Sequence, residues 1–305
     1  MFRKILSKLG IGSANINLVL HEHRVRGGES VSGKFFIEGG TVEQQINKID
    51  VELRLTLNQN GQMQTRTVAT IPVAPGFMIQ AGEKKELPFT YKLPKTLPVS
   101  RNGIRYTFVT RLDIAEGVDH LDEDVVQVLP PLPLEGIFAA FGKLGFREKV
   151  TSGQLKPYGQ EFELFPTDQF REHVQEVEFI ASVEEEGVRI LLELDVYAGS
   201  FGLQEKELKR ELFFSHTELT DVNLLADKLH ETTQEMLDCP YQYTASSYIG
   251  KYPHIPESHG RGHGMVRTIG GFAAGLFAGM LVEELPEDIT GEALDFDEKV
   301  EEEEL

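Results

Sequence analysis

Three histidines lie close together in the segment YPHIPESHGRGHGM, and imidazole nitrogens are common ligands of transition metals. They are His254, His259 and His263. Prolines and glycines surround them, so a flexible backbone would have to be ordered before the three rings could share one ion. No carboxylate is spaced to complete the coordination. We therefore expect a mobile linker at 253–264 and no bound metal or other cofactor, with a metal-binding protein as a weaker alternative.

A pair of adjacent glycines beside an acidic residue opens the segment RGGESVSGKFFI, which begins at Arg26, and such pairs often suggest phosphate binding. A phosphate loop requires GxxxxGK followed by Ser or Thr, and a dinucleotide fingerprint requires GxGxxG at the start of a helix. Neither spacing is present, and the residues that follow alternate as a strand. We therefore expect a turn between two antiparallel strands.

The remaining chemically capable side chains do not form the pattern of an active site. The acidic run DHLDED at 119–124 lacks the ligand spacing of a calcium loop, so we expect an acidic hairpin loop there. Cys239 has no lysine or arginine close in sequence to activate its thiol, which indicates a small space-filling side chain. Neither a GxSxG nor an HExxH motif is present. The sequence predicts a protein that is not an enzyme, with a hydrolase as a weaker alternative.

Charge is distributed unevenly along the 305 residues. The chain has 30 Lys and Arg against 49 Asp and Glu, a net charge of −19. Residues 283–305 hold 12 acids and one base, a net −11, so the rest of the chain carries −19 minus −11, or −8. Nucleic-acid phosphates repel such a chain, and we expect no nucleic-acid partner. A single cysteine excludes an intrachain disulfide, and the first residues lack a signal-peptide apolar run, so we expect a cytoplasmic protein.

The elements that would position any site are predicted to be mainly strands. An Asn-Gly pair at 60–61 marks a tight turn, because both residues accept a positive φ. Antiparallel strands with one apolar face, joined by turns, indicate a β-sandwich. Apolar and polar residues alternate with period two at 16–20, 31–37, 49–57, 65–73, 87–93 and 104–112.

A second set of strands follows a proline-rich junction. The segment VQVLPPLPLEG at 126–136 has three prolines within four residues, which stiffens the chain and places a domain boundary between 130 and 131. A short apolar segment follows, as a helix or the entry to a strand. Strand alternation then resumes and predicts a second sandwich. Helical spacing at 220–238, with Thr220 as the N-cap, predicts one amphipathic helix.

The two ends of the chain carry the candidate contact residues. A short amphipathic helix is predicted at 1–12, where Arg3, Lys4 and Lys8 could meet anionic lipid or dock on the protein itself. A membrane surface is therefore a possible partner, although we do not favour it.

Glycines recur every four residues at Gly271, Gly275 and Gly279, in a helix predicted at 265–285. This spacing allows two helices to approach closely. The uncharged run of 14 residues would span about 21 Å as a helix, less than the roughly 30 Å of a bilayer core. Three interpretations stay open: packing on the same protein, self-association or a partner helix, and membrane insertion. The many acidic residues at 286–305 predict a disordered tail.

Several segments resemble arrestin-like proteins, in the same order and spacing. RGGESVSGKFFI resembles their first turn and strand, and GEKKELPFTYKLPKTLPVS at 82–100 and IRYTFVTRLDI at 104–114 resemble later strands. Within that superfamily, LGIGSANINLVL, GKFFIEGGTVEQQINKIDVEL, LGFREKVTSGQ and SSYIGKYPHIP are similar to bacterial sporulation-control proteins of the stage-zero M type. The resemblance covers residues 1 to about 253. Arg26 and Gly27 stand where the pattern usually has an aromatic residue and proline, so we expect a looser turn there.

The resemblance implies an all-β chain with two arrestin-like sandwich domains, at 13–130 and 131–252. It also implies a regulatory adaptor that affects entry into sporulation by binding other proteins, without catalysis. We expect binding along sandwich edges, loops or the groove between domains. The alternative from another class is a peripheral membrane tether that uses the basic N-terminal helix and the glycine-rich helix. Neither pattern nor resemblance identifies the partner.

Overall fold

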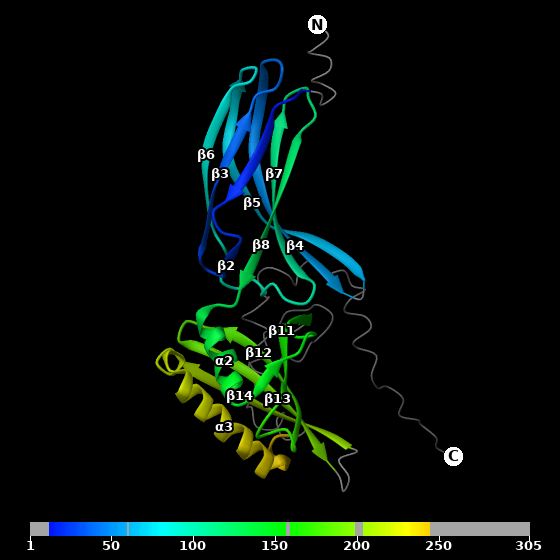
Figure 1. Cartoon of the computed structure of the whole chain (residues 1–305), viewed down its shortest axis with the longest axis vertical. Coiled ribbons are helices and arrows are strands. Elements are labelled where there is room, and N and C mark those ends of the chain that lie inside the picture. The colour runs from blue at the N-terminus through cyan, green and yellow to red at the C-terminus, as the bar shows by residue number, and fades with distance from the viewer. Residues whose placement is uncertain (1–11, 60, 157–158, 199–203, 245–305) are drawn as a thin grey trace, which may run out of the picture.

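The structure is a computed structural model, and it describes residues 12–59, 61–156, 159–198 and 204–244 (Figure 1). This part of the chain consists mainly of antiparallel strands, with two α-helices. An N-terminal unit and a C-terminal unit follow one another along the long axis of the molecule (Figure 1). The helix predicted at 1–12, apart from its last residue, and the segments predicted at 253–264, 265–285 and 286–305 lie outside the described residues.

Among the described residues, eight strands build the N-terminal unit, and two α-helices and six strands build the C-terminal unit. The first unit has β1 (Asn15–Leu20), β2 (Arg24–Arg26), β3 (Ser30–Glu38), β4 (Gln44–Gln59), β5 (Gln62–Ile79), β6 (Lys84–Lys92), β7 (Ile104–Ile114) and β8 (His120–Leu129). The second has α2 (Leu132–Lys143), β9 (Phe146–Glu148), β10 (Gln154–Lys156), β11 (Gly159–Pro166), β12 (Val174–Val183), β13 (Gly187–Ala198), β14 (Gln204–Ser215) and α3 (Val222–Asp238).

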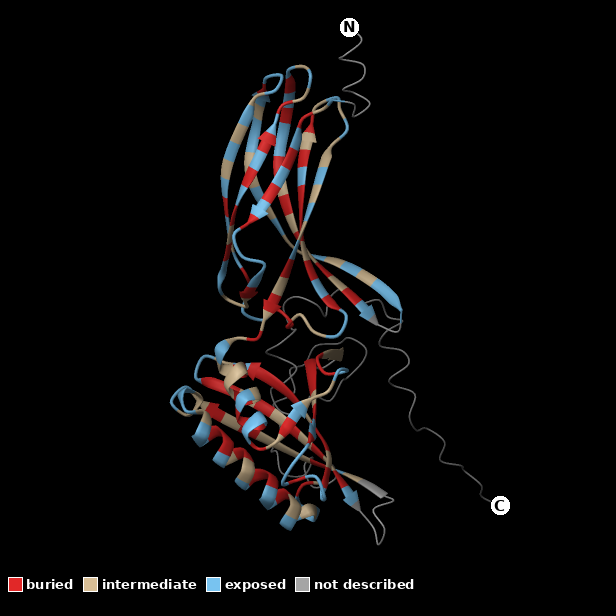
Figure 2. Ribbon diagram, in the orientation of Figure 1, coloured by how far each residue is buried: buried red, intermediate tan, exposed pale blue. Residues whose placement is uncertain are grey.

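The N-terminal unit is a β-sandwich. One sheet has the strand order β1-β3-β6, and the other has the order β2-β8-β7-β4-β5. Alternate side chains of strands such as β1 and β3 are buried, as Figure 2 shows, because successive residues of a strand point to opposite faces. Phe89 packs edge-on against both Phe35 and Phe108, with ring centroids 5.4 Å apart. The period-two pattern in the sequence therefore produces two apolar faces that close on each other.

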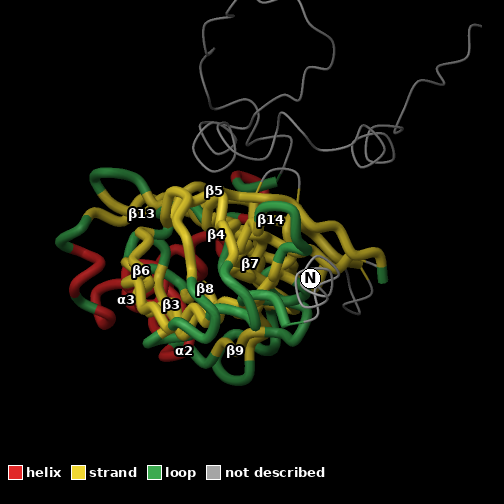
Figure 3. Tube along the Cα trace, turned by 90° about the horizontal axis from the view of Figure 1, so that it is seen from above, coloured by secondary structure: helices red, strands yellow, loops and turns green. Residues whose placement is uncertain are grey.

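The C-terminal unit pairs one sheet with two helices. Strands β10-β11-β12-β13-β14 lie in order, and β9 pairs with β11. Helices α2 and α3 pack together along one side of the molecule, as the end-on view shows (Figure 3). The arrestin-like, all-β prediction is confirmed, and among the described residues the second layer of this unit is helical. Apolar side chains recur there with helical spacing, and the buried ones include Leu134, Ile137, Phe141, Leu225, Leu229 and Met236.

Each unit has its own hydrophobic cluster, and each cluster takes in one residue from the other unit. Val99 belongs to the C-terminal cluster, and Leu155 packs against the N-terminal cluster. The domain boundary that we placed between 130 and 131 stays a prediction.

Two local predictions in the N-terminal unit were wrong. The acidic run at 119–124 is not a loop, because β8 begins at His120 and pairs with β7. The turn after Arg26 is not loose. Gly28, whose φ is +88°, donates its N–H to Leu93 O at 3.1 Å, and Leu93 donates to Glu29 O at 2.9 Å. Both bonds join the turn to Leu93, the residue that follows β6.

The ends of α3 also differ from prediction. Asp221, and not Thr220, is the N-cap, since its carboxylate accepts from Asn223 N at 2.8 Å and from Leu224 N at 3.3 Å. Thr220 instead donates its hydroxyl to Thr217 O at 2.7 Å. Cys239 follows the helix and is exposed, so it does not fill space in the core.

We expect Asp221→Ala to lower the free energy of unfolding by about 1 kcal/mol, because two backbone N–H groups lose their acceptor. Asp221→Asn should lower it by much less. Urea denaturation of the full chain measures both values, and Asp227→Ala, at an exposed site within the same helix, is the control for loss of charge. Equal losses for Asp221→Ala and Asp227→Ala would contradict the assignment.

Candidate functional site

None of the site residues predicted from the sequence lies in the described part of the chain. The candidate metal ligands His254, His259 and His263, and the candidate contact residues Arg3, Lys4, Lys8, Gly271, Gly275 and Gly279, all lie outside it. The structure therefore neither gathers these side chains nor separates them. A candidate site has to be built from residues that the sequence analysis did not select.

The joint between the two units is the part of the fold where distant segments meet through specific polar bonds. The chain passes from β8 to α2 through Pro130 and Pro131, and the second proline is the N-cap of α2. Proline restricts the backbone and removes an N–H donor. The connection is therefore short and stiff, and it brings the start of α2 close to the end of β2.

Arg26, at the end of β2, forms the first bond across this joint. Its Nη2 donates to both carboxylate oxygens of Glu135 in α2, at 2.8 and 2.7 Å. The hydrogen bond with Glu135 raises the pKa of the Arg26 guanidinium, while burial acts in the opposite direction. Arg26, which departs from the resembled pattern, thus forms a bond to the C-terminal unit.

Gln160, in β11, forms the second and most buried bond. Its Oε1 accepts from Val99 N at 2.7 Å, and its Nε2 donates to Val99 O at 2.9 Å and to Gly153 O at 2.9 Å. Gln160 is only 6% exposed, so these backbone groups have little access to water. The carboxamide pairs with the backbone of the other unit much as a neighbouring strand would.

The turn before β7 forms a third set of bonds. Asn102 Nδ2 donates to Thr151 O at 2.6 Å, and Arg101 Nε lies 3.3 Å from Glu148 Oε1. Close approach requires a glycine opposite this turn. A Cβ on Gly153, whose φ is +87°, would lie 2.4 Å from the Cβ of Arg101. Asn102 itself has a φ of +28°, an uncommon conformation for a residue other than glycine.

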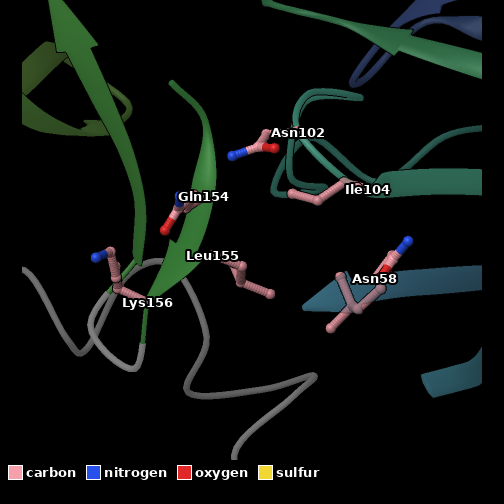
Figure 4. Close-up of a pocket in the computed structure, with 8 residues that line it drawn as sticks. Asn58, Asn102, Ile104, Gln154, Leu155 and Lys156 are labelled. Atoms are coloured by element: carbon pink, nitrogen blue, oxygen red, sulfur yellow. The ribbon is translucent and has the colours of Figure 1, made fainter. Parts of the chain in front are cut away.

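A cavity of about 360 Å³ opens beside these bonds, between the two units (Figure 4). In Figure 4, β10 lies on one side of it, and the end of β4 and the turn before β7 lie on the other. Three side-chain amides, one ammonium group and three aliphatic side chains line it. The lining residues are Leu57, Asn58, Asn102, Gly103, Ile104, Gln154, Leu155 and Lys156.

This lining is suited to binding a ligand. Amides both donate and accept hydrogen bonds, and aliphatic side chains bury apolar groups. Lys156 is already paired with Glu161, at 3.2 Å, so its charge is partly neutralised. The volume falls within the usual range of ligand pockets, which is roughly 300–1,000 Å³. No residue of this lining is a nucleophile held by a neighbouring base.

Sequence reasoning missed the joint, although one signal was present. In β11 the residues Gln160, Phe162 and Leu164 alternate on one face, and Phe162 and Leu164 belong to the hydrophobic cluster. A glutamine at an apolar position of a strand indicates a buried amide that must find partners. The sequence offered no comparable signal for the pairing of Arg26 with Glu135, which are 109 positions apart.

Carboxylates also gather on the sheet of the C-terminal unit, because strand register places Glu163, Glu178 and Glu193 directly opposite one another. Burial, and then the neighbouring acids, raise the pKa of Glu178 to about 7. Lys209 compensates part of this charge and lies 2.9 Å from Glu193. We assign no ion here. Two groups have carboxylate oxygens within 4.8 Å of one another: Glu161, Glu163 and Glu178, and Glu193, Asp195 and Glu207.

Comparison with known proteins shows a consistent likeness. Residues 2–198 match the family described as SpoOM protein. The sporulation-control protein spo0M of Bacillus subtilis (strain 168) is 31% identical over 255 residues, which covers 78% of this chain and 97% of that protein. The crystal structure of Spo0M from Bacillus subtilis superimposes with a TM-score of 0.62 at 29% identity, covering 74% of this chain and 99% of that one.

We expect Gln160→Leu to lower the free energy of unfolding by about 2–4 kcal/mol, because it leaves two backbone carbonyls and one N–H without their partner in a buried place. Urea denaturation of the full chain measures the change.

Gln154→Leu is the matched control, since it removes a half-buried amide from the neighbouring strand β10. Gln154→Leu should lower the free energy of unfolding by less than about 1 kcal/mol. A loss for Gln160→Leu no greater than that for the control would show that the amide does not hold the joint.

Proposed function

Since this chain belongs to the SpoOM protein family, we propose that it is a non-enzymatic regulator that acts by binding a partner protein at the joint between its two units. Its relatives are named for sporulation control, and a regulatory role in sporulation is the function that the family supports. The finer statement, that regulation works through the joint, is the proposal.

The cavity at the joint is the observation that carries this proposal. Residues from both units line it, and bonds such as that of Gln160 to Val99 hold the two walls in place. Because the two walls come from different units, the shape of the site depends on the relative position of the units, which is useful in a regulator. Binding there would be favoured because little ordering cost remains when the walls are already positioned.

An extended polypeptide segment is the ligand class that the lining fits best. Asn58, Asn102 and Gln154 offer donors and acceptors to a peptide backbone, and Leu57, Ile104 and Leu155 offer an apolar surface to its side chains. A strongly anionic ligand fits less well, because Lys156 is engaged by Glu161. The partner is therefore proposed to be a protein with a neutral or mildly polar segment.

We infer the cytoplasm as the compartment, on the basis of a single cysteine and the sporulation-control role for which the relative is named. Among the described residues, no helix is both long and apolar enough to cross a bilayer.

The proposal is tested by filling the cavity. Asn58 is exposed at the end of β4, and Asn58→Arg should place a long side chain in the cavity without disturbing the core. Affinity-tagged full-length chain serves as bait in extract from sporulating bacteria. We expect recovery of the partner by Asn58→Arg to fall at least about tenfold, because about 1.4 kcal/mol of lost binding has that effect.

Gln62→Arg is the control, because it adds the same charge at an exposed position of the same hairpin that does not line the cavity. It should recover the partner as the unaltered chain does. Equal recovery by all three baits would refute binding at the joint. Thermal unfolding midpoints of the three proteins verify that each is folded.

A further inference from the structure

The N-terminal sandwich has a seam where its two sheets meet, between β1 and the first half of β8. Strand β1 pairs with β3 on one side, and β8 lies along its other side. Among the described residues, the only strand that pairs with β8 on this side is β2, through a short parallel contact from Gln127 to Leu129 of β8. The segment of β8 from residue 120 to 126 therefore meets β1 without a backbone ladder.

Side chains of β8 take the place of that ladder. Ile16 N donates to His120 Nδ1 at 3.4 Å, and Leu18 N donates to Asp122 Oδ2 at 2.6 Å. Both acceptors lie on the inward face of β8, because alternate residues of a strand share a face. Asp124 is the next residue on this face. A hydrogen bond from a backbone N–H to a carboxylate is strong in this place because the sandwich partly excludes water.

Asp124 lies in the seam with one carboxylate oxygen buried and unpartnered. Its Oδ2 has no hydrogen-bond partner, and the Oγ1 of Thr110, a residue with no exposed surface, has none either. Thr110 is on β7, directly opposite Asp122. A buried polar atom without a partner is costly, and the cost is larger when the group is charged. The seam therefore holds a carboxylate in a place that disfavours its charge.

The groups around Asp124 compensate this charge only in part, through His23. Asp122 and His120 are the titratable residues on the same face of β8 as Asp124. His23, on the connection after β1, is a further titratable neighbour. Strand β1 contributes the apolar Leu18 and Leu20, and β7 contributes Phe108 opposite Asp124 and the neutral Tyr106, whose hydroxyl bonds to Pro98 O. On β2, Val25 is buried, Arg24 is exposed and Arg26 is held by Glu135.

We propose that Asp122 and Asp124 form a carboxyl pair that closes the seam when it holds one shared proton and loosens it when both groups are charged. With the proton present, one carboxyl donates to the other and Leu18 keeps its acceptor. Without it, two adjacent negative charges repel each other in a poorly hydrated place. The seam is thus a proton-sensitive element of the sandwich.

The direction of this sensitivity follows from the pKa of Asp124. Burial, then the charge of Asp122 and the hydrogen bond with it, raise this pKa to about 6, while His23 acts in the opposite direction. The unfolded chain releases the same proton near pH 4, as an ordinary aspartate does (about 3.9). Between these values the folded state holds a proton that the unfolded state lacks. The seam is therefore more stable at the acidic end and loses stability as the pH rises through about 6.

The seam is continuous with the joint between the units. Gln127 N donates to His23 O at 2.7 Å, and His23 Nδ1 lies 3.3 Å from Val125 O, which ties the connection after β1 to β8. The next strand, β2, ends in Arg26, the residue that binds Glu135. A change in the seam would therefore occur close to the joint, the site of the proposed function. The proposal about the seam does not depend on that function.

Hydrogen–deuterium exchange of the full chain tests the proposal at about pH 5 and about pH 7.5, with rates corrected for intrinsic exchange. We expect the protection of residues 15–20 to fall about tenfold between the two conditions. At pH 5, one unit below a pKa of about 6, proton linkage gives about tenfold, and the full shift of about two pKa units would be expressed only below about pH 4. Asp124→Asn should abolish this fall by keeping the pair singly charged.

Glu123→Gln is the matched control, since it removes one charge from the exposed face of the same strand and should keep the fall of the unaltered chain. If Asp124→Asn does not fold, Asp122→Asn replaces it, because an amide there can still accept from Leu18 and can donate to Asp124. Equal protection of the unaltered chain at both pH values, or the same fall in the folded asparagine variant, would overturn the proposal.

Discussion

The pairing of the Gln160 carboxamide with the backbone of Val99 is the interaction on which the arrangement of the two units depends. It satisfies an N–H and a C=O of one unit with a side chain of the other, in a place that is almost closed to water. Buried backbone groups must have partners. The units can therefore separate only by exposing these groups or by leaving them unpaired. The stiff proline connection and the Arg26–Glu135 bond restrict the same movement at the other side of the joint.

The cavity is a consequence of the same bonds. The turn at Asn102 and Gly103 reaches the C-terminal unit, where Gly153 leaves room for it, and the end of β4 follows because Asn58 N donates to Gly103 O at 3.0 Å. The space that remains has amides from both sides. The rigidity of the joint and its proposed binding function are thus linked. The residues that hold the units together also define the shape of the surface that a partner would meet.

Negative charge is used in two different ways in this chain. On the sheet of the C-terminal unit, register aligns carboxylates that lysines such as Lys209 partly neutralise. In the seam of the N-terminal unit, Asp122 instead serves as a backbone acceptor for β1. The first use gathers carboxylates on a sheet face, whereas the second supplies a backbone acceptor where the two sheets of the sandwich meet. Both raise the pKa of a carboxyl group, at Glu178 and at Asp124, because burial and like charge act together there.

The sequence by itself determined the strands, the antiparallel sandwich of the N-terminal unit and the arrestin-like family, because period-two alternation and turn residues are local signals. It also located the helix at 220–238 to within two residues. It did not determine that helices would cover the second sheet, nor that DHLDED would form part of a strand, because a polar run has no apolar period to reveal its pairing. The joint was decided only by the tertiary structure. Arg26 and Glu135, or Val99 and Gln160, are far apart in the chain, and their bonds depend on how two completed units pack, which no local pattern encodes.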